Sequence, residues 1–378
     1  MNEIIAKLDQ EKIVQTFLAL VPIDNAALHE RAMADELLRR LRQLGLVPHE
    51  DETYHRTGGD AGNIFVRVPG GLDLPPLLFS AHLDSVAPAC GKKAVVHDDG
   101  RITSDGTTVL GADDLAGLTE ILSALELYLE VPVAERRPLE LLFTYAEELY
   151  DVGSEFFDFT QIAARESYVL DASGPIGTYL YQAPSIISFD VQIKGRAAHA
   201  GFTPEAGIHA IRIAAEAIAA LNLGHVAPNT TANVGEIHGG TNTNNVPESC
   251  RVTGEVRSYD HELALAQIEK MRSTFATAAQ KYGGEITFTT RIGCRAYRTP
   301  DKAPAIKRFE SACRATGLTP RPEASFGGSD QNRLTQHGLT GIVLACGMTD
   351  CHSVHEYITE SDLLAATRLV LALMLSRE

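Results

Sequence analysis

This sequence lacks several features that mark whole classes of protein. No stretch of it approaches the roughly 18 apolar residues of a membrane-spanning helix. The start, Met1-Asn2-Glu3-Ile4, has neither the basic segment nor the small-residue cleavage site of a signal peptide. Its six cysteines are scattered without paired spacing, which favours free thiols in a reducing compartment. We therefore expect a cytoplasmic protein that does not interact with membranes.

Basic residues are also scarce. Lys and Arg number 33 against 49 Asp and Glu, so the formal net charge is -16. A charge of this sign disfavours nucleic acid and anionic membrane surfaces as partners, because both are themselves negative. What is present is the composition of a globular protein, with 44% hydrophobic and 22% charged residues. A chain of 378 residues exceeds one ordinary hydrophobic core and predicts two domains.

Imidazoles and carboxylates recur just beyond apolar, strand-like runs. Open α/β sheets place their functional sites at the carboxyl ends of strands, so these side chains are expected to gather there. A set of His, Asp and Glu is typical of zinc, and several carboxylates together suit a two-metal hydrolase. The pattern therefore indicates an enzyme. The residues concerned are His82, Asp84, Asp113, Asp114, Glu147, Glu148, Asp171, His352 and His355.

The first half of the chain alternates strand-like and helix-like segments. Residues 24–44 have the apolar spacing of an amphipathic helix, with Asp24 as its predicted N-cap and Gly45 as the residue that ends it. A second helix is predicted over residues 115–129. The alternation continues to Asp171 and predicts an α/β fold whose mainly parallel sheet is covered by helices on both faces.

The pattern changes after Asp171. Strands are predicted at 185–194, 231–237, 250–257 and 285–292, and helices at 204–221 and 262–282. The order βαββαβ is that of a ferredoxin-like α+β unit. The α/β pattern resumes after Arg291 and ends in a helix at 361–375. We therefore predict a discontinuous domain of residues 1–177 and 292–378, with a second domain of residues 178–291 inserted into it.

Several short motifs resemble those of the M20 metallopeptidase family, most closely its peptidase T-like branch. Each motif is weak alone, but their order along the chain is the family's, and the ordered set is specific. The matches extend from about residue 60 to residue 356. They are His82-Leu83-Asp84, Asp105-Gly106-Thr107, Gly111-Ala112-Asp113-Asp114, Glu147-Glu148, Gly195-Arg196-Ala197-Ala198-His199-Ala200-Gly201, Gly239-Gly240-Thr241-Asn242-Thr243-Asn244, Gly254-Glu255-Val256-Arg257-Ser258 and Gly327-Gly328-Ser329-Asp330.

The resemblance implies a zinc-dependent exopeptidase-type catalytic domain that holds two Zn²⁺ ions, with Mn²⁺ or Co²⁺ as alternatives. His82 and Asp171 would bind one metal, and Asp113 would bridge both. Glu148 and His352 would bind the second metal. Two metals held in this way polarise a carbonyl and lower the pKa of a water molecule.

Two neighbouring acidic residues take supporting roles in the same resemblance. Asp84 would accept the second N–H of the His82 imidazole and fix its tautomer. Glu147 would be the general base, moving a proton from water to the leaving amine. The family also implies a cis peptide bond between Asp113 and Asp114.

The last ligand position requires a choice between neighbouring residues. Family ligands lie four residues before the Glu of this motif, Glu356, which selects His352. His355 is then expected near the metal ligands or the substrate. Cys351 is a soft alternative, but a thiolate would be unusual among carboxylate ligands.

The resemblance also assigns roles outside the metal ligands. His199, in the inserted domain, would reach the active site of the partner subunit and stabilise the oxyanion. The inserted domain would therefore act as a lid and would also form a homodimer. Substrate contacts are implied for Asn244, Arg257, Gly328, Ser329 and Asp330.

The predicted function is hydrolysis of amide bonds in short peptides, with an aminopeptidase or tripeptidase favoured. Peptidase T itself is expected to carry Arg directly before the Gly-Gly-Ser/Thr-Asp motif, whereas this chain has Phe326. An N-acyl amino acid amidohydrolase with the same metals and base is the alternative within the hydrolases. A non-catalytic peptide-binding member is a third hypothesis, against which the presence of Glu147 argues.

Overall fold

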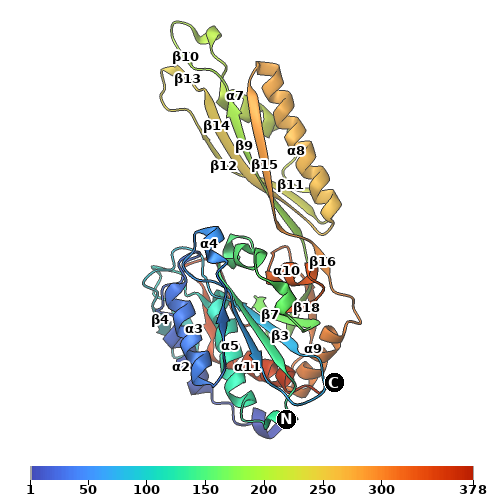
Figure 1. Ribbon diagram of the computed structural model, residues 1–378. Helices are drawn as coiled ribbons and strands as arrows, with labels where there is room; N and C mark the ends of the chain where they lie inside the picture. The colour runs from blue at the N-terminus through green and yellow to red at the C-terminus, as the bar shows by residue number, and fades with distance from the viewer. Residues whose placement is uncertain (1, 378) are drawn as a thin grey trace. The chain divides into compact units, whose positions relative to one another are not determined.

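A computed structural model describes residues 2–377, and the chain in it divides into two compact units (Figure 1). The large unit comprises Met1–Gln182, Arg298–Ser325 and Ser329–Glu378. The inserted unit comprises Ala183–Tyr297 together with Phe326–Gly328. No helix within residues 2–377 is long and apolar enough to cross a membrane.

The large unit is built on a mixed, mainly parallel sheet. Its strands lie in the order β1-β2-β6-β3-β7-β18-β8-β16, and β17 pairs with β8. The four neighbours β6, β3, β7 and β18 run parallel, as predicted for an α/β fold. The strands are β1 (His49–Glu50), β2 (Ile64–Val68), β3 (Leu77–His82), β6 (Leu139–Thr144), β7 (Glu166–Ala172), β8 (Thr178–Ala183), β16 (Tyr297–Arg298), β17 (Arg321–Ala324) and β18 (Thr340–Ala345).

Alternate residues of these strands feed two apolar layers. Phe79 and Leu141 join the larger core, beneath α2 (Gln10–Leu20), α3 (Arg31–Gln43), α5 (Ala112–Tyr128), α9 (Pro304–Ala315) and α11 (Glu360–Met374). Leu78 and Leu142, one residue along, join a smaller core with Leu334 of α10 (Asp330–Gln336). Burying each such side chain contributes about 1.5–3 kcal/mol, which ties the sheet to helices on both faces.

The predicted start of the first amphipathic helix was wrong. α3 begins at Arg31 rather than after Asp24. Asp24 instead accepts a hydrogen bond from Gly91 N at 2.7 Å, and Leu28 adopts a left-handed φ of 70°, which is incompatible with a continuous helix. The predicted end is confirmed, since Gly45 follows α3 with a φ of 76°.

The inserted unit contains the predicted βαββαβ elements and one further strand, β11, which was not predicted from the sequence and lies between α7 and β12. Its strands form an antiparallel sheet in the order β11-β12-β14-β9-β15, and α7 and α8 pack against each other and against this sheet (Figure 1). The predicted helix from Pro204 was wrong at its start, because residues Pro204–Ala206 form a 3₁₀ turn and α7 begins at Ala210. The elements are β9 (Ser185–Lys194), α7 (Ala210–Ala220), β11 (Gly224–Ala227), β12 (Thr230–Gly239), β14 (Ser249–Ser258), α8 (His261–Tyr282) and β15 (Glu285–Cys294).

One edge of the inserted sheet is covered over only part of its length. β11 pairs with Thr230, Thr231 and Ala232 at the start of β12. Within the described strands, residues 233–239 of β12 pair on one side only, with β14. Ile237 is 48% exposed on this segment. An unpaired strand edge of this kind is a template for another strand.

The remaining elements are short. A three-stranded sheet pairs β19 (Tyr357–Thr359), β5 (Arg101–Ser104) and β4 (Ala94–Val96). In the inserted unit β10 (Ala198–His199) pairs with β13 (Asn245–Val246). The short helices of the large unit are α1 (Asn2–Ile5), α4 (Tyr54–Thr57) and α6 (Val152–Glu155).

Candidate metal centre

Five side chains converge where the parallel strands of the large unit end. His82 is the last residue of β3, and Asp171 lies near the end of β7. Glu148 follows β6 in a 3₁₀ turn, and Asp113 lies in the first turn of α5. His352 lies in the turn between β18 and β19 and has a left-handed φ of 60°. These are the five residues predicted as ligands, and the fold brings all of them together.

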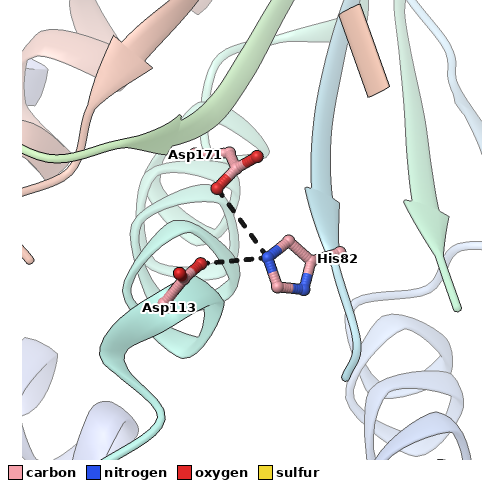
Figure 2. A group of neighbouring side chains, drawn as sticks. All are labelled: His82, Asp113 and Asp171. Carbon is pink, nitrogen blue, oxygen red and sulfur yellow. Dashed lines mark hydrogen bonds and ion pairs between the residues drawn. The ribbon is translucent and has the colours of Figure 1, made fainter. Parts of the chain in front are cut away.

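Asp113 lies between the two imidazoles. Its Oδ1 is 3.1 Å from His82 Nε2, and its Oδ2 is 3.1 Å from His352 Nε2. His82 Nε2 also lies 3.8 Å from Asp171 Oδ1, as Figure 2 shows. The geometry therefore defines two three-residue groups that share the Asp113 carboxylate, the second of which is Asp113, Glu148 and His352.

The electrostatics of this cluster call for additional positive charge. Burial raises the pKa of Asp171 to about 7, because its charged form is poorly solvated beside other carboxylates. Hydrogen bonds to Asp113 and Glu148 raise the pKa of His352 to about 10. Glu148 Oε1 is buried and has no hydrogen-bond partner among the described residues. Two divalent cations would satisfy these groups, so the donor set fits a dinuclear metal centre.

Asp84 supports the centre differently from the prediction. The nearer partner of His82 Nδ1 is the Asp84 backbone carbonyl at 3.0 Å, while the Asp84 carboxylate is 3.4 Å away. That carboxylate instead accepts hydrogen bonds from Glu147 N at 2.9 Å and Glu148 N at 3.1 Å. Asp84 thus fixes the imidazole through its main chain and the Glu147-Glu148 turn through its side chain.

Glu147 lies in that turn, directly after Ala146, whose φ is 49°. Burial and the neighbouring charge of Asp171 raise its pKa well above the ordinary range of a glutamic acid. A carboxylate whose pKa is raised is a stronger base, so it can take a proton from water and then give it up. The position and the environment of Glu147 therefore suit proton transfer beside the metal ligands.

Two further acidic residues hold the loops that carry the site: Glu356, which served in the sequence only as the reference position of a motif, and Glu30, which was not identified from the sequence. Glu356 accepts from Gly111 N at 2.7 Å and from Asp113 N at 2.9 Å. Glu30 accepts from Ala146 N at 2.9 Å, directly before the Glu147-Glu148 turn. Both side chains are buried, which is the one signal that marks them, and burial is not visible in the sequence.

The peptide bond between Asp113 and Asp114 is cis, as predicted. The Asp114 carboxylate accepts a hydrogen bond at Oδ2 from His82 N at 3.1 Å. The two adjacent aspartates therefore have separate tasks: one carboxylate faces the imidazoles, and the other holds the end of β3.

His352 rather than its neighbours belongs to the cluster. His355 is exposed, and its backbone N–H donates to Ser353 Oγ at 3.1 Å. Burial raises the pKa of the Cys351 thiol, which disfavours the thiolate form that a metal requires. All six cysteines are free thiols, as predicted, although Cys90 is exposed.

His199 lies in the inserted unit, in the short strand β10. Its Nδ1 accepts hydrogen bonds from Gly201 N at 3.1 Å and Phe202 N at 3.2 Å. The proton of the neutral ring must therefore be on Nε2, which makes that atom a donor. Asn244 is close by, since its carbonyl accepts from Ala200 N at 2.9 Å.

The other predicted substrate contacts have structural partners of their own. The Arg257 guanidinium binds Glu255 with two hydrogen bonds, at 2.6 and 3.1 Å, and donates to Phe326 O at 2.8 Å. A side chain at Gly328 would place a Cβ 2.4 Å from Cys294 Sγ. Ser329 N donates to Asn332 Oδ1 at the start of α10, and the buried Asp330 accepts from Thr144 Oγ1. Their contact with substrate stays a prediction.

Comparisons with known proteins agree with this fold and centre. Residues 63–177 match the model of peptidase family M28, and residues 181–283 match the peptidase dimerisation domain of the M20 proteins. The uncharacterized protein YqjE of Bacillus subtilis (strain 168) is 33% identical over 366 residues, 97% of this chain and 98% of that protein.

Two solved structures are similar over nearly the whole chain. The aminopeptidase PepT from Bacillus cereus ATCC 10987 is 35% identical with a TM-score of 0.86, over 97% of this chain and 98% of that one. A tripeptidase from Staphylococcus aureus subsp. aureus mu50 is 32% identical with a TM-score of 0.91, over the same shares. Fold and site together define a hydrolase of the dinuclear metallopeptidase class. The chain belongs to the M20 peptidase family, in its peptidase T-like branch.

Proposed function

We propose that this protein is an aminopeptidase that releases the N-terminal residue of tripeptides and other short peptides. The observation that carries the proposal is the Asp113 carboxylate placed between two imidazoles, with Glu147 in the turn that also carries Glu148. The names of two relatives support the peptide specificity, since one is an aminopeptidase and the other a tripeptidase. The free cysteines support a cytoplasmic location.

Two zinc ions are the proposed cofactors. His82, Asp113 and Asp171 would hold one, and Asp113, Glu148 and His352 the other. Zinc in such a site supplies Lewis acidity toward the scissile carbonyl and makes a water molecule acidic near neutral pH. Each ion would have one imidazole and a terminal carboxylate, which leaves coordination positions for water and substrate.

Glu147 would carry the proton of the reaction. Its carboxylate takes a proton from the attacking water and gives it to the leaving amine, so one group serves as base and then as acid. Asp84 keeps this side chain in place by binding the backbone N–H groups of Glu147 and Glu148. Glu30 holds the preceding peptide in the same way.

His199 would stabilise the negative oxygen of the tetrahedral intermediate in the active site of a partner subunit. The two backbone N–H groups on Nδ1 leave Nε2–H as the donor, which is the tautomer that this role needs. A homodimer is supported by the match to a dimerisation domain and by the uncovered β12 edge at residues 233–239. Asn244 would contact the same substrate.

One observation favours a second candidate function, hydrolysis of N-acyl amino acids. Arg257 is bound by Glu255, and Phe326 stands where the tripeptidase pattern would have an arginine. In an N-acyl amino acid the carboxylate lies on the residue directly after the scissile amide, one residue nearer than in a tripeptide, so such a substrate does not need a guanidinium at the more distant position. Metals and base would be unchanged.

A mixed substrate panel tests these proposals. Zinc-loaded enzyme is incubated with dipeptides, tripeptides and N-acyl amino acids, and the products are identified by mass, with Glu147→Gln as the inactive control. Release of N-terminal residues from tripeptides is the expected result. Cleavage confined to N-acyl substrates would favour the second function, and no cleavage of either class by protein that holds two metals would contradict both.

A further inference from the structure

A cavity of the large unit lies at the opposite end of the parallel strands from the metal centre. Its volume is about 600 Å³, and its wall is formed by the last turns of α5 and α11, by α9, and by the segment that leads into β6. Arg137, two residues before β6, lines it and donates from Nε to Pro75 O at 2.8 Å, just before β3. His82 ends that same β3, so one strand of six residues, about 20 Å, separates the two sites.

The wall of this cavity is rich in positive charge although the chain as a whole is strongly negative. Four arginines line it, Arg136, Arg137, Arg308 and Arg377, against two glutamates, Glu130 and Glu135. Glu130 pairs with Lys7 at 2.6 Å, and Glu135 pairs with Arg377, one of these four arginines, at 3.5 Å, so Arg136 and Arg137 are not neutralised by either glutamate. An excess of arginine in a concave wall is the usual composition of an oxyanion site.

Arg136 provides the most specific indication of a ligand. Its side chain is only 6% exposed, and its Nε is buried without a hydrogen-bond partner among the described residues. Its Nη1 donates to Leu129 O at 3.4 Å, and no ion pair joins it to any described carboxylate. The Arg136 guanidinium also lies 5.9 Å from the centroid of the Tyr128 ring, which lines the same cavity. Because a buried guanidinium without a carboxylate partner is costly, an anion in the cavity would supply the missing negative charge.

The neighbouring arginines increase the positive charge that an anion would compensate. Burial and the nearby charge of Arg308 lower the pKa of Arg137, which shows that the guanidinium groups are crowded. Arg308 is partly compensated by Glu166 at 3.1 Å. Capping of helix ends explains some donors, such as Arg137 Nη1 to Ser376 O at 3.5 Å. It does not explain why Arg136 Nε lacks a hydrogen-bond partner among the described residues.

We propose that this cavity binds a small organic anion whose phosphate or carboxylate group contacts Arg136 and Arg137. The planar guanidinium fork matches both oxyanions. The cavity is much larger than an inorganic phosphate, and part of its wall is apolar, including Val131, Ala315 and Leu375. The ligand is therefore an amphipathic molecule with one charged end and an apolar body.

Binding of phenyl phosphate and of benzoate to the metal-loaded protein tests the proposal and separates the two oxyanions. Calorimetry gives the affinity. Hydrogen–deuterium exchange shows which residues are protected and so distinguishes binding in the cavity from binding at the metals. The expected result is protection of residues 129–137 and a loss of affinity of at least about tenfold in Arg136→Gln, as when a charged hydrogen bond is removed. Arg42→Gln, an exposed arginine of α3, is the matched control and should bind as the wild type does.

Several results would overturn the proposal. One is failure of both probes to protect residues 129–137, and another is equal binding by the wild type and Arg136→Gln. If Arg136→Gln does not fold, Arg137→Gln, which removes the other proposed contact, replaces it with the same expected loss of affinity. None of these results depends on peptidase activity.

Discussion

Glu30 offers a sharp test of how this fold supports its active site. The residue is fully buried at the start of α3. Its Oε1 accepts from Leu28 N at 2.8 Å and from Ala146 N at 2.9 Å, whereas Oε2 has no partner among the described residues. Burial, together with the charge of Asp84, raises the pKa of Glu30 to about 8. The carboxyl group is therefore protonated in the folded protein at neutral pH.

Because Glu30 is protonated in the folded protein, we expect the free energy of unfolding to fall as the pH rises. The ordinary pKa of 4.5 applies to the unfolded chain, so between pH 4.5 and about 8 the folded protein holds one proton more. Its contribution to stability is fully present below pH 4.5 and is lost as the pH rises toward 8. The slope is at most about 1.4 kcal/mol per pH unit, or about 2.7 kcal/mol between pH 6 and pH 8.

Glu30→Gln removes the titration while keeping the shape of the protonated acid. The free energy of unfolding is measured with urea at pH 6, 7 and 8 for wild type and variant at fixed zinc concentration. We expect the wild type to lose stability relative to the variant as the pH rises, by up to about 2.7 kcal/mol over this range. Glu52→Gln, an exposed acid of the same unit, serves as control and should follow the wild type. Parallel curves for wild type and Glu30→Gln would refute the reasoning.

The same residue connects stability to catalysis. Glu30→Ala removes the acceptor for Ala146 N–H and frees the turn that carries Glu147. We expect kcat to fall by about tenfold because the turn that carries Glu147 is no longer held in place. The zinc content should be unchanged. Glu30→Gln, which keeps an acceptor oxygen, should retain most of the activity. Equal kcat in all three proteins would show that the contact does not position Glu147.

Three other predictions concern the reaction itself. Glu147→Gln should bind two metals yet lose about 10²–10⁴-fold in kcat, and loss of metal from this variant would contradict its role as base. His199→Ala should also be inactive with metals bound, and mixing it with Glu147→Gln should restore activity through shared sites; absence of recovery would refute the shared site. Phe326→Arg should raise turnover of tripeptides relative to dipeptides, measured as kcat/KM, and an unchanged ratio would argue against the missing carboxylate contact.

The sequence predicted the fold because its elements follow simple periodicities. The βαββαβ order was readable from alternating runs such as Ser185–Lys194, whose even and odd residues face opposite sides of the sheet. The start of α3 was misread because apolar spacing continues upstream of Arg31. The left-handed φ of Leu28 and the contact of Asp24 with Gly91 prevent the helix from starting earlier. Neither feature appears in the periodic spacing of apolar residues.

The ligand set was predictable for a different reason. His82, Asp113 and Asp171 each stand at the end of a strand or the start of a helix, and their order along the chain is the family's. The residues that hold these loops were not predictable. Glu30 and Glu356 accept hydrogen bonds from backbone N–H groups of distant segments. Almost every residue has such a group, so the sequence of the partner segment gives no sign of the bond.

The place of the insertion within the sheet has a consequence for how the protein is made. β7 lies between β3 and β18, yet the chain of the whole inserted unit emerges from the ribosome before β18 does. During synthesis, the β7 edge therefore lacks its partner β18 until the inserted unit has been made. His352 leaves the ribosome later still. A partly synthesised chain thus has only one of the two metal-binding triads, and the complete centre forms only when synthesis is almost finished.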